Sequence, residues 1–150
     1  MAIKKTIATG GNARQIQHAP FVANTVTQFL VEHVFKETVA ATGTDILEVA
    51  QLPAYCRLLN AEVVGIGLGA TTIEAGLMTG EPFDTDPART VNGIIFPAGT
   101  AVATLQQAPL DRLLPIQGVG LIRSIGVRFS AAVTADIAKR LILRLTYAAT

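Results

Sequence analysis

The side chains that usually carry out chemistry are sparse in this chain and stand far apart. Its 150 residues include two histidines, His18 and His33, one cysteine, Cys56, and two serines, Ser124 and Ser130. The histidines are too distant in sequence to form a recognisable ligand pair, and neither serine has the glycine-flanked context of a hydrolase nucleophile. These residues predict no catalytic or metal centre, so we expect a protein that is not an enzyme and needs no cofactor.

Two short motifs resemble ligand sites, but each has a simpler interpretation. The run GIGLGA, residues 65–70, matches part of a dinucleotide fingerprint, yet a β-branched run follows where that motif needs a helix. We interpret it as a glycine-rich hairpin between two strands. The run EPFDTDPAR, residues 81–89, gathers Glu81, Asp84 and Asp86 as calcium sites do, without the EF-hand spacing. We interpret it as an acidic, solvated loop.

The composition favours a function carried out by binding to other chains. Half of the residues are hydrophobic, 15% are charged and the mean hydropathy is +0.45, whereas ordinary globular domains carry roughly 25% charged residues. Cys56 has apolar neighbours, which indicates a small buried side chain rather than a reactive thiol, although Arg57 beside it argues the other way. We expect a single domain with some apolar surface placed against other chains.

Neither a membrane span nor a secretory signal is predicted. A spanning helix needs about 20 consecutive apolar residues, and polar residues and prolines interrupt the longest uncharged stretch, residues 90–110. The first residues, MAIKK, are not followed by the apolar run of a signal peptide. We expect no membrane partner.

From about residue 26 onward, short β-rich segments alternate with turn residues, which predicts an all-β fold, an antiparallel β-sandwich. We expect strands at residues 29–36, 45–49, 57–68, 71–78, 90–96, 100–106, 113–116, 119–129 and 139–147. The last strand alternates most clearly and places on one face Leu141, Leu143, Leu145 and Tyr147. The strand before it places on one face Val119, Leu121, Ile125, Val127 and Phe129. Arg123 interrupts that face, and its charge must reach solvent, a partner chain or an acid.

In residues 1–24 the hydrophobic residues follow neither the helical nor the strand period, and the segment contains Gly10, Gly11 and Pro20. They indicate either an extended arm that can cross onto a neighbouring chain or a disordered terminus. We expect an extended N-terminal arm at residues 1–24, followed by a β-sandwich domain at residues 25–150.

Charge is unevenly distributed along the chain. Residues 1–28 hold three bases and no acid, residues 29–90 nine acids against three bases, and residues 91–150 six bases against two acids. The segments either form complementary patches between copies or mix within the fold. Candidate interface residues are Lys4, Lys5, Arg14, Arg123, Arg140 and Arg144. The bases are not interleaved with aromatic residues, so we expect no nucleic acid partner.

The run VAATGTDILEVAQLPAYCRLLNAEVVGIGL, residues 39–68, is followed by TIEAGLMTGEPFDTD and later by RLILRLTYAA. Over about residues 26–150 this layout resembles the small jelly-roll capsid decoration, or cement, proteins of tailed bacteriophages. The resemblance implies a jelly-roll-like sandwich, made in the host cytoplasm, that assembles as a trimer or dimer on the outer surface of the capsid. Its partner there would be the major capsid protein, whose neighbouring subunits it would clamp together on the virion.

A second hypothesis is a jelly-roll ligand-binding module, such as a glycan-binding head of a viral fibre. Sugar recognition usually exposes aromatic platforms, and this chain has no tryptophan and two tyrosines, Tyr55 and Tyr147. The aromatic content therefore favours the capsid protein over the glycan-binding head.

Overall fold

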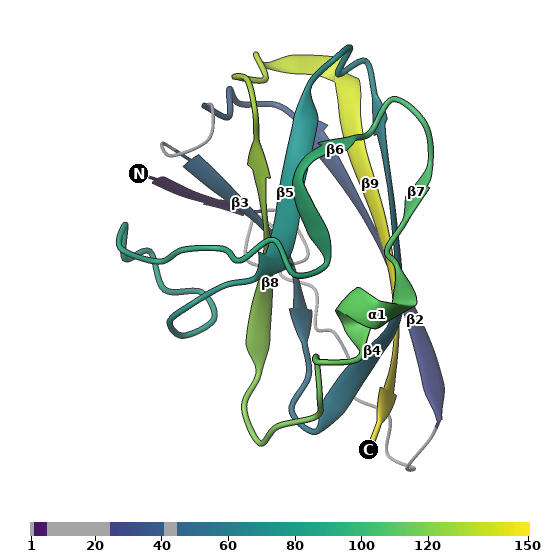
Figure 1. The fold of residues 1–150 in the computed structure, drawn as a ribbon. Coiled ribbons are helices and arrows are strands. Elements are labelled where there is room, and N and C mark those ends of the chain that lie inside the picture. The colour runs from purple at the N-terminus through teal and green to yellow at the C-terminus, as the bar shows by residue number, and fades with distance from the viewer. Residues whose placement is uncertain (1, 6–24, 41–44) are drawn as a thin grey trace.

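The computed structural model describes residues 2–5, 25–40 and 45–150. Within these residues the chain is almost entirely β-structure (Figure 1), which confirms the predicted all-β sandwich. The strands are β1 (Ala2–Lys5), β2 (Val26–Phe35), β3 (Asp45–Leu52), β4 (Cys56–Ile66), β5 (Thr72–Leu77), β6 (Phe96–Ala101), β7 (Gln106–Gln107), β8 (Arg123–Phe129) and β9 (Asp136–Ala149). A short helix, α1 (Leu110–Leu113), lies between β7 and β8. Among the described residues, no helix has the length and hydropathy that crossing a membrane requires.

Two sheets pack face to face. Sheet A has the strand order β1-β3-β8-β5-β6, and sheet B has the order β2-β9-β4-β7. Neighbouring strands are antiparallel except β1 and β3, which run parallel. Strands β2 to β9 therefore form two four-stranded sheets between which the chain crosses repeatedly, as in a jelly roll.

The main core lies between the sheets. β9 shows the predicted alternation, and its inward side chains are at most 2% exposed: Leu141, Leu143, Leu145 and Tyr147. The ring of Phe35 on β2 meets that of Phe129 on β8 edge-on, with 5.6 Å between centroids. Cys56 is fully buried, as predicted. Each large side chain buried in this way contributes roughly 1.5–3 kcal/mol, so this inner layer is the main source of stability.

The outer face of sheet A is covered as well. Residues 78–95 leave β5 on the side of sheet A that points away from sheet B (Figure 1). A second, smaller apolar cluster forms there from Ile46, Met78 and Val91, with Ile3 of β1 packed against it. Sheet A is therefore buried on both faces in its central strands, as sheets are when other elements cover them.

Several local predictions are wrong. Residues 65–70 do not form a hairpin, because β4 belongs to sheet B and β5 to sheet A, so this segment crosses between the sheets. In the predicted strand at 90–96, Val91 makes a single bridge with Met78. The predicted strand at 113–116 contains the end of α1 instead, since Pro109 precedes the helix and Pro115 cannot continue it.

The predicted face of residues 119–129 is only partly correct. Ile125, Val127 and Phe129 are fully buried, but Val119 and Leu121 lie before β8 and are exposed. Of the predicted arm, Ala2–Lys5 lies in the described part of the chain, where it pairs in parallel with β3 from Asp45 to Glu48. The prediction for residues 6–24 lies outside the described residues.

Candidate interaction surfaces

No cluster of histidine, cysteine and carboxylate side chains able to hold a metal ion occurs within residues 2–5, 25–40 and 45–150. His33 is half-buried on β2, and burial lowers its pKa to about 4, against the opposing effect of Glu37. Burial raises the pKa of the Cys56 thiol, with Arg123 acting in the opposite direction. Both groups are therefore uncharged at neutral pH, which suits packing rather than chemistry. His18 lies outside the described residues.

The acidic loop at residues 81–89 turns its carboxylates towards solvent. Asp84 accepts a hydrogen bond from the backbone N–H of Asp86 at 3.0 Å, and Asp86 accepts one from Ala88 at 2.9 Å. Such short-range bonds shape the backbone of the loop itself. The exposed positions of Asp84 and Asp86 agree with the predicted solvated loop.

Arg89, at the end of the same loop, is buried instead. Its guanidinium donates to the carbonyl oxygens of Thr79 at 2.8 Å and Asp84 at 2.7 Å, and lies 3.5 Å from the carboxylate of Glu48 on β3. Glu48 is fully buried and accepts a hydrogen bond from the Ser124 hydroxyl at 2.5 Å. Buried charges need partners of this kind. The cluster therefore fastens the loop to sheet A.

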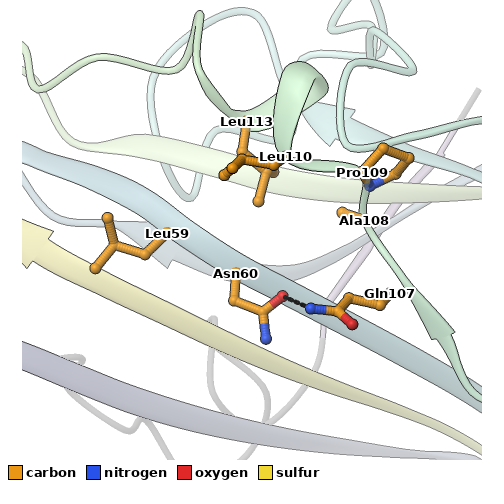
Figure 2. Close-up of a pocket in the computed structure, with 7 residues that line it drawn as sticks. All are labelled: Leu59, Asn60, Gln107, Ala108, Pro109, Leu110 and Leu113. Atoms are coloured by element: carbon orange, nitrogen blue, oxygen red, sulfur yellow. Dashed lines mark hydrogen bonds between the residues drawn. The ribbon is translucent and has the colours of Figure 1, made fainter.

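A hollow of about 580 Å³ opens between α1 and the edge formed by β4 and β7 (Figure 2). One polar contact crosses it, in which the Gln107 side-chain amide donates to the Asn60 carbonyl oxygen at 3.1 Å. Its lining is otherwise mainly aliphatic and consists of Leu59, Asn60, Gln107, Ala108, Pro109, Leu110 and Leu113. With no ionisable group in its lining, the hollow suits an apolar side chain better than a reaction.

Many of the exposed apolar side chains come from two segments that contact each other, the turn before β4 and residues 110–122. Of the eleven large hydrophobic residues that are exposed in the described residues, six come from the turn before β4 and from residues 110–122. We call these six the end patch: Tyr55, Leu110, Leu114, Val119, Leu121 and Ile122. Residues 113–122 contain no charged side chain. Exposed apolar side chains on neighbouring segments are candidates for an interaction site in soluble proteins.

Backbone contacts hold the end patch in place. Tyr55 has a positive φ of 59°, which non-glycine residues rarely adopt, and its N–H donates to the carbonyl of Val119 at 2.6 Å. Arg123 donates to the carbonyls of Cys56 at 3.2 Å and Gln117 at 2.7 Å. The predicted need of Arg123 for solvent, a partner or an acid is thus met by backbone carbonyls, and desolvation lowers its pKa. The end patch is therefore presented in a fixed shape, which reduces the entropy lost on binding.

Arg140 and Arg144 lie on the outer face of sheet B. Arg140 pairs with Glu32 of β2 at 2.6 Å, and Arg144 pairs with Glu62 of β4. Both arginines are about half exposed, so this face carries neutralised pairs rather than a basic patch. Ile142 lies between them on the same strand.

The other candidate interface residues lie elsewhere. Lys4 on β1 is 3.7 Å from the carboxylate of Glu37. Lys5 also belongs to β1, and Arg14 lies outside the described residues. The structure thus brings Arg140 and Arg144 together on sheet B and separates them from Lys4 on sheet A and from Arg123 beside the end patch.

The geometry defines a jelly-roll protein, and the candidate sites that its described residues present are surfaces. No protein-family model and no curated protein matches the chain. Among solved structures, a chain of the capsid of Ralstonia phage GP4 is 26% identical, with 99% of each chain covered and a TM-score of 0.82. A chain of the capsid asymmetric unit of cyanophage Pam1 is 17% identical over 95% of this chain and 99% of that one, with a TM-score of 0.51, and shows the fold alone.

This protein is therefore related to phage capsid proteins and has a structural role in the virion.

Proposed function

We propose that the protein is a capsid decoration, or cement, protein that binds the outside of an icosahedral phage head and clamps neighbouring major capsid subunits. The observation that carries this proposal is the similarity to the Ralstonia phage GP4 capsid chain, which extends over 99% of both chains at a TM-score of 0.82. The resemblance of residues 26–150 to decoration proteins supports an external position rather than that of the major capsid protein. This role requires binding and no catalysis.

The end patch is the surface best suited to contact the shell. Leu121 and Ile122 are 67% and 50% exposed. A Cβ added at Gly118 would lie 2.9 Å from the backbone oxygen of Tyr55, and one added at Gly120 would lie 3.1 Å from its hydroxyl. An apolar anchor that is already ordered loses little conformational freedom when it binds. The hollow beside Leu110 and Leu113 would extend this contact by accepting a side chain of a capsid subunit.

Binding of this kind stabilises a shell through mass action. A protein that binds the assembled lattice and not its free subunits shifts the equilibrium towards the lattice. Repetition over many symmetric positions adds to the effect, because each bridge between neighbours turns a second contact into an intramolecular one. Heads lacking the protein should therefore lose their DNA at a lower temperature.

Co-sedimentation with expanded shells of the major capsid protein tests the proposal. The wild-type chain should pellet with the shells, and Leu121→Asp together with Ile122→Asp should abolish binding while the fold is kept. Ile137→Asp is the matched control, because Ile137 is 75% exposed and lies at the start of β9, outside the end patch. We would abandon the proposed function if the wild-type chain stayed in the supernatant.

Two further results separate the surface from the function. Shell binding that survives the Leu121→Asp and Ile122→Asp changes would leave the decoration role standing and move the contact elsewhere. Loss of binding in Ile137→Asp as well would show that any added charge is enough to disrupt it, which removes the argument for the end patch.

A further inference from the structure

The sheets end in four edge strands, and three of them are poorly suited to accept another strand. β1 has four residues, and β7 has two. β6 contains Pro97 and Gly99, the latter at a φ of 89°, and its register on β5 shifts at Ile73/Ala75. Short strands, prolines and bulges are the usual devices that keep sheet edges from pairing.

β2 lacks all of these devices. It has ten residues, contains neither proline nor glycine, and keeps a regular register on β9 from Val26 to Val34. Its other side has no partner strand among the described residues. A long, regular edge of this kind offers a row of N–H and C=O groups to another strand.

The side chains of β2 also lack cover on the outer face of sheet B. Leu30 is 64% exposed and Val26 is 55% exposed. Leu30 lies in register with Arg144, whose guanidinium is engaged by Glu62. The apolar surface of Leu30 is thus left beside a charged pair, without an explanation within the single chain.

We propose that two copies pair through β2, antiparallel across a two-fold axis at Leu30, so that the four strands of each sheet B join in one continuous sheet. Residues directly opposite in an antiparallel pair point to the same face. The axis therefore places Leu30 opposite Leu30 of the second copy, Gln28 opposite its Glu32, and Val26 opposite its Val34. Apolar side chains meet apolar ones, and polar meet polar.

Neighbouring registers do not achieve this match. An axis at Val31 would place Leu30 opposite Glu32, and an axis at Phe29 would place Leu30 opposite Gln28. In the Leu30 register the two Glu32 carboxylates are not opposed, and each keeps its ion pair with Arg140 at 2.6 Å. The sequence of β2 is thus complementary to itself in one register, which identifies a second copy of this chain as the occupant.

This arrangement deepens the proposed function, although it does not depend on it. Antiparallel pairing directs the two end patches to opposite ends of the dimer. Such a dimer can reach two neighbouring sites on a shell at once, which is what a clamp requires, and gains the avidity of two linked contacts.

Cysteine cross-linking tests the register. Native Cys56 is buried and does not compete. In Leu30→Cys, position 30 faces itself within the distance that a disulfide spans, so a covalent dimer should form under mild oxidation. The rate should exceed that of Ile137→Cys, an exposed control, by at least about tenfold, because pairing replaces random collision.

Two single variants provide a stricter control. Gln28→Cys and Glu32→Cys should not cross-link alone, because each faces the other position and its own counterpart lies four residues away, about 13 Å along the strand. A mixture of the two variants should form a covalent heterodimer. Leu30→Lys should reduce the solution mass from dimer to monomer by light scattering without changing its melting behaviour by more than a few degrees.

The proposal is overturned if Leu30→Cys cross-links no faster than Ile137→Cys. That result would show that another occupant, such as residues 6–24 or a shell subunit, holds the edge. The proposal is equally overturned if the wild-type protein is a trimer in solution and the Leu30→Lys variant remains one. If the covalent dimer forms but does not sediment with shells, the pairing stands and only the proposed function fails.

Discussion

The outer faces of the two sheets differ in one respect that governs much of the molecule's behaviour. On sheet A, residues 78–95 cover the face, Ile3 of the edge strand β1 packs against the same cluster, and every residue of β3 from Ile46 to Ala50 is buried. On sheet B no segment within the described residues covers the face, which we call the bare face, and β2 alternates between exposed Leu30 and buried Val31. The covered face is a second core, whereas the bare face is available to other chains.

Ion pairs show what this difference means energetically. Arg89 and Glu48 on sheet A are 2% and 0% exposed, whereas Arg140 and Glu32 on sheet B are 47% and 44% exposed. Water solvates the second pair whether or not it is intact, but the first depends on its own partners. Four substitutions, taken from the largest expected effect to the smallest, test this contrast.

Arg89→Met should destabilise the protein most. It leaves the Glu48 carboxylate buried without its cation and removes the two hydrogen bonds that Arg89 donates to the carbonyl oxygens of Thr79 and Asp84. We expect a loss of about 3–5 kcal/mol in the free energy of unfolding, the usual cost of breaking a buried pair from one side. Urea unfolding followed by circular dichroism measures it.

A second variant separates charge from packing. Adding Glu48→Gln to Arg89→Met removes the stranded charge and should recover a large part of the loss. A loss below about 1 kcal/mol for Arg89→Met alone would mean that the pair behaves like a surface pair, and the contrast between the two faces would be wrong.

Gly76→Ala should have the next largest effect, because it forces the cover off sheet A. A Cβ at Gly76 would lie 2.2 Å from the backbone oxygen of Asn92, which cannot swing aside as a side chain can. We expect a loss of roughly 2–3 kcal/mol and faster proteolysis within residues 78–95.

Gly126→Ala is the matched control, since Gly126 faces Gly76 in the register of β8 and β5. The Cβ there would meet only side chains, those of Met78 at 2.7 Å and Ile46 at 2.9 Å, and side chains, methionine above all, adapt more readily than backbone. Equal losses in both variants would argue against a rigid cover.

The bare face also explains why sequence patterns predict sheet B better than sheet A. β9 alternates because one side meets water, and this period can be read directly from residues 140–147. β3 is buried on both sides, so its apolar run predicts a strand but not that Glu48 lies inside. The partner Arg89 is distant in sequence, and no local pattern connects the two.

The end patch could not be predicted from the sequence pattern for a related reason. Val119 and Leu121 continue the alternation of Ile125 and Val127, so periodicity alone assigns them to the strand. Gly118 and Gly120 were the available signal, because they allow the chain to pack closely against Tyr55 in a loop. Periodicity shows which face a strand buries, and it does not show where the strand begins.

The pH dependence of the free energy of unfolding tests the environment of His33 on β2, the edge strand of sheet B. Burial holds its pKa at about 4, below the value of 6.5 in the unfolded chain, so the unfolded chain binds a proton first as the pH falls. The stability that neutral His33 allows is complete above pH 6.5 and is lost as the pH falls from 6.5 to 4. The full shift corresponds to about 3.4 kcal/mol, and we expect roughly 2 kcal/mol because His33 is still partly exposed to water. His33→Gln should remove this part of the pH dependence in urea unfolding. Parallel curves for the two proteins would mean that His33 titrates normally in the folded state.

Arg140→Ala should have the smallest effect. It removes the contact with Glu32 at 2.6 Å, but both side chains are already about half in water, so we expect a loss below about 1 kcal/mol that shrinks further as salt is added. The measurement is best made over a range of protein concentrations. A loss as large as that of Arg89→Met at high concentration, falling away on dilution, would show that a second chain covers this face and desolvates the pair. A large loss at every concentration would contradict the description of the face as bare.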